Sequence, residues 1–225
     1  MRILIVSNKE WHRKYINEIQ ARTGAEVIYI DDKLAVNKEK IEEIAPDWVF
    51  FPHWSYIIPA EVYESFSCVI FHMTDLPFGR GGSPLQNLIA RGIYETKLSA
   101  IRCVKELDAG DVYKKVPLSL WGTAEEIYMR SAELIKEIII EMVQNPSVPV
   151  PQQGTPVVFR RRKPEDGNLE TCDNLQQIFD YIRMLDAEGY PNAFWETDKM
   201  RLEFSRASLR DGEILADVKI TMKGE

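Results

Sequence analysis

A histidine and a carboxylate stand in two glycine-containing segments of this 225-residue chain. His72 opens the segment HMTDLPFGRGGSP, residues 72–84, directly after an apolar run, and Asp108 lies in the short segment LDAGD. Glycine has no Cβ atom, so such loops let main-chain groups approach a ligand closely. A histidine and a carboxylate are the minimum needed to move a proton near neutral pH. The two segments are therefore the first candidates for an active site.

The order and spacing of these segments resemble a known family. The pattern H-x-S/T-x-L-P-x-x-R-G-x-x-P followed by L-D-x-G is similar to that of the formyltransferases that use 10-formyltetrahydrofolate, among them methionyl-tRNA formyltransferase and the sugar N-formyltransferases. The resemblance covers about residues 1–165. It implies that 10-formyltetrahydrofolate is the formyl donor and that His72 and Asp108 are catalytic.

One position departs from the family pattern. Ile70 stands where the family has an asparagine, two residues before the histidine. Isoleucine cannot donate a hydrogen bond to the oxyanion that forms during formyl transfer. Thr74, a water molecule or an amide from elsewhere must take that role, and we predict Asn87, near the start of the helix that Pro84 opens. A solvated surface amide is an equally good interpretation of Asn87.

The resemblance also implies where the two substrates bind. The segments after the third strand and before Asp108 should hold the pterin, because a flat ring suits an apolar wall with a few backbone donors and acceptors. The residues predicted to bind the cofactor are Pro52, His53, Trp54, Phe78, Gly82, Val104, Lys105, Glu106 and Leu107. Those predicted to bind the acceptor are Thr74, Arg80, Arg161 and Arg162. Ordinary core packing is the alternative for the aromatic residues, and a solvated strand end for the basic run 160–163.

The apolar runs around these motifs predict the elements that position them. Strands are expected at residues 2–7, 26–31, 48–51 and 69–71, and helices at 9–22 and 34–44. This alternation predicts an α/β fold with a Rossmann-like, mostly parallel sheet, whose ligands bind beyond the carboxyl ends of the strands. His53 and His72 both fall just past such ends. The first strand–helix junction lacks G-x-G-x-x-G, which excludes a dinucleotide dehydrogenase.

The second half of the chain predicts further helices and strands and a domain boundary. Helices are expected at residues 84–91, 123–143 and 175–187, and strands at 98–106, 112–120, 200–205 and 213–222. Thr123 and Glu126 form a capping-box signature for the longest helix. We predict a catalytic domain at residues 1–165 and a small C-terminal α+β appendage at residues 166–225.

Composition narrows the class of protein. The formal net charge of −7 argues against a general nucleic-acid binder. No run of about 20 apolar residues predicts a membrane span, and no signal peptide is visible. The three cysteines are an odd number without C-x-x-C spacing, which favours reduced thiols and a cytoplasmic location. The three histidines form no ligand set, so no metal is expected.

These observations favour a small-molecule acceptor. Only about 55 residues follow the predicted catalytic segment, and they are not basic, unlike the C-terminal domain that the resemblance implies for methionyl-tRNA formyltransferases. The sequence therefore predicts a sugar N-formyltransferase that acts on the amine of a nucleotide-linked amino sugar in polysaccharide biosynthesis, with no nucleic-acid or membrane partner and a homodimer as a candidate assembly. The alternatives are an enzyme like glycinamide ribonucleotide formyltransferase, or a non-catalytic folate- or nucleotide-binding module.

Overall fold

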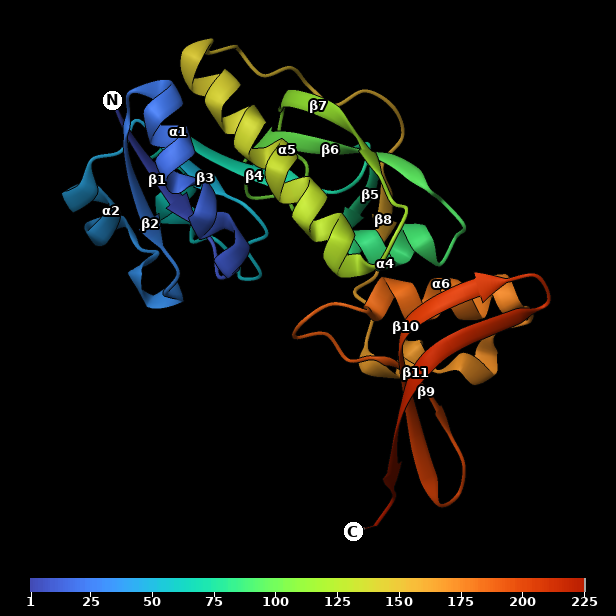
Figure 1. The fold of residues 1–225 in the computed structure, drawn as a ribbon. Coiled ribbons are helices and arrows are strands. Elements are labelled where there is room, and N and C mark those ends of the chain that lie inside the picture. The colour runs from blue at the N-terminus through green and yellow to red at the C-terminus, as the bar shows by residue number, and fades with distance from the viewer. Residues whose placement is uncertain (225) are drawn as a thin grey trace. The chain divides into compact units, whose positions relative to one another are not determined.

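The computed structural model describes residues 1–224 and forms two compact units from interleaved stretches of chain (Figure 1). The sheet unit comprises Met1–Gly81, Lys97–Leu118 and Met129–Val158. The hairpin unit comprises Gly82–Thr96, Ser119–Tyr128 and Phe159–Glu225. The predicted domains were continuous segments, whereas two internal stretches here belong to the same unit as the C-terminal segment.

The sheet unit contains a six-stranded sheet of order β2-β1-β3-β4-β6-β7. β1 pairs in parallel with β2 and β3, β3 pairs in parallel with β4, and β4 pairs antiparallel with β6. This confirms the predicted α/β fold with a mostly parallel sheet. The strands are β1 (Arg2–Val6), β2 (Glu26–Ile30), β3 (Trp48–Phe51), β4 (Cys68–His72), β6 (Glu95–Arg102) and β7 (Val112–Ser119). A separate pair joins β5 (Phe78–Gly81) to β8 (Val157–Phe159).

Helices cover this sheet because successive strand residues point to opposite faces. Leu4 and Phe51 pack in one core cluster with Ile41 of α2. On the opposite face, Ile5 lies near Ile19 of α1 and the middle turns of α5. The helical elements are η1 (Glu10–Tyr15), α1 (Ile16–Thr23), η2 (Lys33–Ala35), α2 (Lys38–Ile44), α3 (Ala60–Tyr63) and α5 (Ala124–Gln144), of which η1 and η2 are 3-10 helices.

The predicted elements differ from the structure at their ends and in two helices that are each divided. The helix predicted at 9–22 is the 3-10 helix η1 followed by α1. The helix predicted at 34–44 is two elements, because the Asn37 side chain accepts a hydrogen bond from Lys40 N (3.0 Å) and starts α2 afresh. The strand predicted at 98–106 ends at Arg102. The capping box is confirmed, since Thr123 N donates to Glu126 Oε2 (2.8 Å) and Glu126 N donates to Thr123 Oγ1 (3.3 Å).

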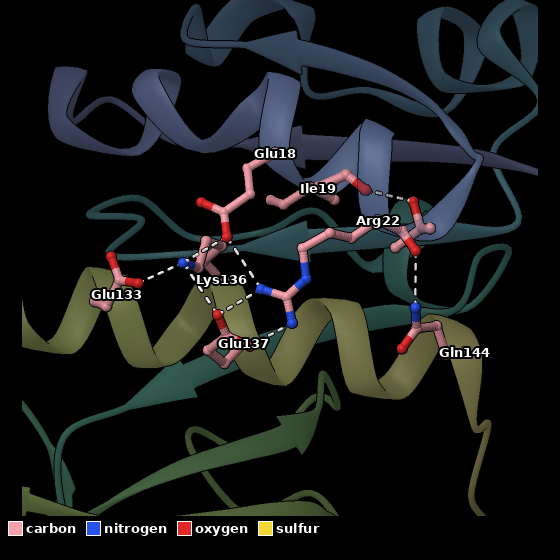
Figure 2. A network of polar contacts seen from close by, with 8 residues as sticks. Glu18, Ile19, Arg22, Glu133, Lys136, Glu137 and Gln144 are labelled. Atoms are coloured by element: carbon pink, nitrogen blue, oxygen red, sulfur yellow. Dashed lines mark hydrogen bonds and ion pairs between the residues drawn. The ribbon is translucent and has the colours of Figure 1, made fainter.

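Charged side chains join α1 to α5 within the sheet unit (Figure 2). Lys136 of α5 is only 5% exposed and contacts Glu18 (2.9 Å), Glu137 (3.0 Å) and Glu133. Arg22 of α1 makes a two-pronged contact with Glu137, at 2.7 and 2.8 Å. The two positive groups share their carboxylates, so α1 and α5 are connected by a network rather than by isolated ion pairs.

The hairpin unit contains an antiparallel sheet of order β11-β10-β9. α6 packs against all three strands, which confirms the predicted C-terminal helix and hairpin. The buried Arg183 guanidinium donates to Asp180 (2.7 Å) and to the carbonyl of Leu120 (2.6 Å). The elements are α4 (Pro84–Ile89), the 3-10 helices η3 (Pro164–Gly167) and η4 (Leu169–Thr171), α6 (Leu175–Leu185), β9 (Ala193–Glu196), β10 (Met200–Arg210) and β11 (Glu213–Met222).

Candidate functional site

His72 is the last residue of β4, at the carboxyl end of a buried strand in the sheet unit. Its Nε2 lies 2.7 Å from the carbonyl oxygen of Gly79 in the loop that follows. A carbonyl oxygen only accepts, so Nε2 carries the proton of this hydrogen bond. The Nδ1 atom of a neutral His72 ring therefore has a free lone pair. The loop thus fixes which ring nitrogen can take up a proton.

Asp108 lies beside that nitrogen. Its Oδ2 is 3.5 Å from His72 Nδ1, and both side chains are less than a tenth exposed. The same oxygen accepts a hydrogen bond from Gly81 N (2.9 Å). If His72 gained a proton at Nδ1, the positively charged ring would face the Asp108 carboxylate. That carboxylate stabilises the positive charge, and burial keeps water from screening the attraction. The structure therefore brings together the two residues on which the predicted chemistry depends.

Local backbone geometry explains the segment LDAGD. Asp108 adopts φ 53°, a left-handed conformation that aspartate tolerates better than most residues. A Cβ atom on Gly110 would lie 1.8 Å from the carbonyl oxygen of Arg102, so only glycine fits there. These two positions turn the chain sharply between β6 and β7. The turn-forming interpretation of the segment and the functional one are both satisfied by the same residues.

Gln152 joins the two loops and was not recognised in the sequence. Its Nε2 donates to the carbonyls of Asp108 (2.8 Å) and Gly110 (2.9 Å). Its Oε1 accepts from Arg80, at 3.1 Å from Nε and 2.8 Å from Nη2. Nothing local distinguishes Gln152 from the exposed Gln153 beside it, so the sequence offers no signal for this role.

Two of the predicted substrate-binding residues are Arg80, which is hydrogen-bonded to another side chain, and Thr74, which is buried. The Arg80 guanidinium bonds to Gln152, as described. The Thr74 side chain is fully buried, and its Oγ1 has no hydrogen-bond partner within residues 1–224. Its carbonyl accepts from Ser99 Oγ (2.7 Å). An unsatisfied buried hydroxyl is costly, so a polar group that approached this loop would find a ready donor.

Asn87 uses its amide within the hairpin unit. Its Nδ2 donates to the carbonyls of Gly82 (3.0 Å) and Arg160 (2.9 Å). An amide nitrogen carries two hydrogens, so both are engaged and none remains for an oxyanion. Ile70, at the family's asparagine position, packs against the apolar core. This arrangement argues against the predicted oxyanion role of Asn87 and favours a structural role, in which its amide holds the segments of Gly82 and Arg160 together.

The residues predicted to bind folate follow β3 and precede Asp108. His53 adopts φ 48°, and its Nδ1 lies 2.7 Å from His12 Nε2 while its Nε2 lies 3.1 Å from Ser131 Oγ. Burial, with a smaller effect of neighbouring positive charge, lowers the pKa of His12 to about 2 and that of His53 to about 3, so both rings are neutral. Both ring nitrogens of His53 thus serve the fold.

The rest of the predicted cofactor set differs in exposure. Pro52 is buried, and Trp54 is half-buried with Nε1 lacking a hydrogen-bond partner in the described chain. Leu107 (61%) and Phe78 (36%) expose large apolar side chains in the sheet unit. Val104 is half-buried, while Lys105 and Glu106 are exposed. Their contact with folate stays a prediction.

Gly82, Arg161 and Arg162 lie in the hairpin unit. A Cβ atom on Gly82 would meet Arg161 Cβ at 2.6 Å, so glycine allows the two segments to pack closely. The Arg162 guanidinium lies 5.1 Å above the Tyr181 ring and donates to the Asp166 carbonyl (2.6 Å). Packing engages both segments, and their roles in binding stay predictions.

Within residues 1–224, histidine, cysteine, aspartate and glutamate side chains form no group of three or more that could hold a metal ion. No helix in this part of the chain is long and apolar enough to cross a membrane.

Comparison with known proteins gives strong similarity over the full chain. A solved structure, methionyl-tRNA formyltransferase from Clostridium thermocellum, is 49% identical with a TM-score of 0.95, covering 99% of this chain and 99% of that one. Methionyl-tRNA formyltransferase of Francisella philomiragia is 25% identical over 197 residues. This stretch is 83% of the present chain and 62% of the relative, so the chain spans less than two thirds of that relative's length.

Two further comparisons match the C-terminal part of the chain to a family model and the fold to a more distant structure. Residues 164–221 match the family model of the methionyl-tRNA formyltransferase C-terminal domain. HypX from Aquifex aeolicus, solved in complex with tetrahydrofolic acid, is 20% identical with a TM-score of 0.75, covering 92% of this chain and 38% of that one. At that identity the likeness is one of fold.

Proposed function

Because the chain belongs to the formyltransferase family, we propose that it transfers a formyl group from 10-formyltetrahydrofolate to the amine of methionyl-tRNA. The observation that carries this proposal is the 49% identity, over 99% of both chains, with the methionyl-tRNA formyltransferase of Clostridium thermocellum. The α-amino group of the esterified methionine is the nucleophile in this reaction.

The sugar N-formyltransferase predicted from the sequence is wrong. The overturning finding is the same full-length match, together with the curated methionyl-tRNA formyltransferases, since sugar N-formyltransferases among the solved structures share the fold at only 19% identity. The expectations of a nucleotide-linked sugar as substrate and of no nucleic-acid partner are therefore wrong as well. They rested on the short, non-basic segment after the predicted catalytic domain and on net charge, which is a sum over the chain and does not report how charge is distributed locally.

The geometry of His72 and Asp108 supports amine formylation. When bound, 10-formyltetrahydrofolate supplies an activated formyl carbon for the attacking amine. The attacking nitrogen must shed a proton as its bond to that carbon forms. His72, with Nε2 held by Gly79, offers Nδ1 as the acceptor, and Asp108 at 3.5 Å stabilises the resulting positive ring.

The surroundings of the pair fit a folate. Phe78 and Leu107 expose apolar side chains on the loops next to His72 and Asp108. Trp54 Nε1 and Thr74 Oγ1, which follow neighbouring parallel strands, are buried polar atoms without hydrogen-bond partners in the described residues. A ligand with a flat apolar ring and several polar atoms complements that combination.

The Thr74 hydroxyl is our candidate for the oxyanion donor that Ile70 does not supply. It is unpartnered, and it lies two residues after His72, whereas both amide hydrogens of Asn87 are engaged. Thr74→Val should lower the rate of the chemical step by about 10²-fold, Thr74→Ser should retain most of it, and Asn87→Ala should affect stability first. A full rate in Thr74→Val would reject this donor.

The proposed function is tested by mixing the protein with 10-formyltetrahydrofolate and aminoacylated tRNA. We expect formyl-methionine on tRNA and an equal amount of released tetrahydrofolate. Free methionine, a nucleotide-linked amino sugar and glycinamide ribonucleotide serve as competing acceptors. Transfer to glycinamide ribonucleotide alone, or folate binding with no transfer to any acceptor, would overturn the proposal. His72→Asn is the matched inactive control, because it keeps a similar size and polarity.

A further inference from the structure

The β9–β10–β11 sheet has one apolar face and one face that carries its ion pairs together with Phe194 and Leu215. Strand register decides this, because directly paired residues of antiparallel strands point to the same side. Met200 pairs with Met222, Leu202 with Ile220 and Phe204 with Val218, and Trp195 pairs with Leu202. The opposite side carries the ion-paired residues Glu196, Arg201, Glu203 and Lys219.

Much of the apolar face is exposed, although large apolar side chains normally avoid water in such clusters. Ile220 is 60% exposed and Met222 55%, and their neighbour Val218 is 46% exposed. Ile214 and Ala216, on the same face nearer the hairpin turn, are half-buried. Figure 1 shows the hairpin running on past α6 toward the C-terminus, which leaves that end of β11 without a covering element from its own unit. We call Trp195, Met200, Val218, Ile220 and Met222 the apolar patch.

β11 is also an edge strand, with a free row of main-chain groups. The direction of these groups follows from one hydrogen bond. Lys223 N donates to Lys199 O (2.8 Å), and this pair continues the Met200–Met222 register. Hydrogen-bonded pairs alternate along an antiparallel ladder, so the odd-numbered residues of β11 face β10. The even-numbered residues, including Val218, therefore point their N–H and C=O groups to the open edge.

We propose that β11 pairs antiparallel with β11 of a second copy of this chain, about a two-fold axis at Val218. In that register Val218 faces the partner's Val218 as a hydrogen-bonded pair, which uses the outward main-chain groups on both edges. Ala216 then lies opposite the partner's Ile220, and Ile214 opposite the partner's Met222. Each exposed end of the patch thus comes to lie beside the half-buried end of the other copy, and the two apolar faces form one surface.

Charge complementarity selects this register and this occupant. On the face that carries the ion pairs, Asp217 lies opposite the partner's Lys219, and Glu213 lies opposite the partner's Lys223. The two-fold axis repeats each contact, giving four pairs of opposite sign and none of like sign at these positions. Opposite charges directly across an antiparallel pair stabilise it, and like charges destabilise it. A lysine on an edge often prevents sheet growth, but here each lysine meets a carboxylate.

The proposal is tested by sedimentation velocity of the full chain over a range of concentrations. We expect a monomer–dimer equilibrium for the wild type. Val218→Lys, at the axis, should shift it to monomer, whereas Leu34→Lys, which alters an exposed leucine of the sheet unit, should leave it unchanged. Far-UV circular dichroism and thermal melting check that each variant is folded. A wild type that is monomeric throughout, or a dimer that survives Val218→Lys, would overturn the proposal.

The register has its own test. Asp217→Lys makes positions 217 and 219 both positive, and Lys219→Asp makes both negative. Each variant alone should dimerise at least tenfold more weakly than wild type, because like charges then meet across the axis. An equimolar mixture of the two should dimerise again, because positive edges meet negative ones. The Asp217 and Lys219 side chains are themselves exposed (52% and 73%) where they contact Arg206 and Glu203 of their own chain, so folding should persist. No recovery on mixing would reject this register.

Discussion

His72 Nδ1 lies 3.5 Å from Asp108 Oδ2, with both side chains more than nine-tenths buried. The 35 residues between them contain the loop whose Gly79 carbonyl accepts from the other ring nitrogen of His72, and Gly81 N donates to the carboxylate. The pair is therefore fixed from both sides by main-chain groups. Such fixing favours proton transfer without reorganisation during the reaction.

Asp108→Asn should lower kcat/KM by about 10²-fold or more, because an amide keeps an acceptor for Gly81 N but loses the negative charge that stabilises a protonated His72. The measurement is single-turnover formylation of methionyl-tRNA. Asp111→Asn, in the same segment, is the matched control and should stay within about twofold of wild type, as surface changes usually do. Equal effects of the two substitutions would contradict a specific role for Asp108.

Gln152→Leu should slow formyl transfer more than it weakens substrate binding. Loss of the amide leaves the carbonyls of Asp108 and Gly110 without their donor and frees Arg80. A small displacement of a positioned group typically costs about 10- to 100-fold in rate. The test compares kcat with KM at a temperature where circular dichroism shows the variant to be folded. Gln153→Leu is the control, and a Gln152→Leu variant with unchanged kcat would reject a positioning role.

Lys136→Met should destabilise the protein by about 1–3 kcal/mol, because it removes the central cation from three carboxylates, of which Glu18 and Glu137 keep only Arg22 as a partner in this network. The side chain is 5% exposed, and the network connects α1 with α5 (Figure 2). Urea unfolding measures the change. Lys38→Met is the control, since Lys38 pairs with Glu42 at 3.5 Å on the surface and should cost less than about 1 kcal/mol. Similar costs for both would show that the network adds nothing.

Stability should fall as the pH is lowered from about 7 to 5, because of His12 and His53. Their folded pKa values, about 2 and about 3, lie below the usual 6.5, so in this window the unfolded chain binds protons that the folded chain does not. Each histidine contributes at most about 1.4 kcal/mol per pH unit. The Arg22 contact lowers the pKa of Glu137 to about 2. Glu137 therefore changes the stability only below about pH 4.5, outside the window of pH 7 to 5.

The measurement for this prediction is the free energy of unfolding in urea at pH 7, 6 and 5. His12→Asn/His53→Asn should be less stable at pH 7 but show a flatter dependence on pH, because no buried imidazole remains to be protonated on unfolding. His72→Asn is kept as a comparison, since it leaves the His12–His53 contact intact. An equally steep slope in the double variant would contradict the assignment.

Local features of the sequence determined the sheet and the placement of its loops. The apolar runs ending at Phe51 and His72 predicted buried parallel strands, because the side-chain period and the crossover rule act over short distances along the chain. Thr123 with Glu126 predicted the start of α5 by the same local logic. The pairing of His72 with Asp108 followed from the resemblance of the two motifs to the family pattern. Strand ends alone do not place it, because β4 and β6 are antiparallel and Arg102, the last residue of β6, pairs with Val69 near the start of β4.

Tertiary structure decided which residues far apart in the sequence contact one another. Gln152 Nε2 donates to the Asp108 carbonyl, 44 residues away in the sequence. The Arg160 carbonyl accepts from Asn87 Nδ2, 73 residues away. No local pattern marks such contacts, since a glutamine or asparagine looks the same whether its partner is water or a carbonyl. The short, non-basic C-terminal segment and the net charge misled the choice of acceptor, and net charge did so for a related reason. It is a property of the whole chain, whereas recognition depends on where the folded chain places each charged and apolar group.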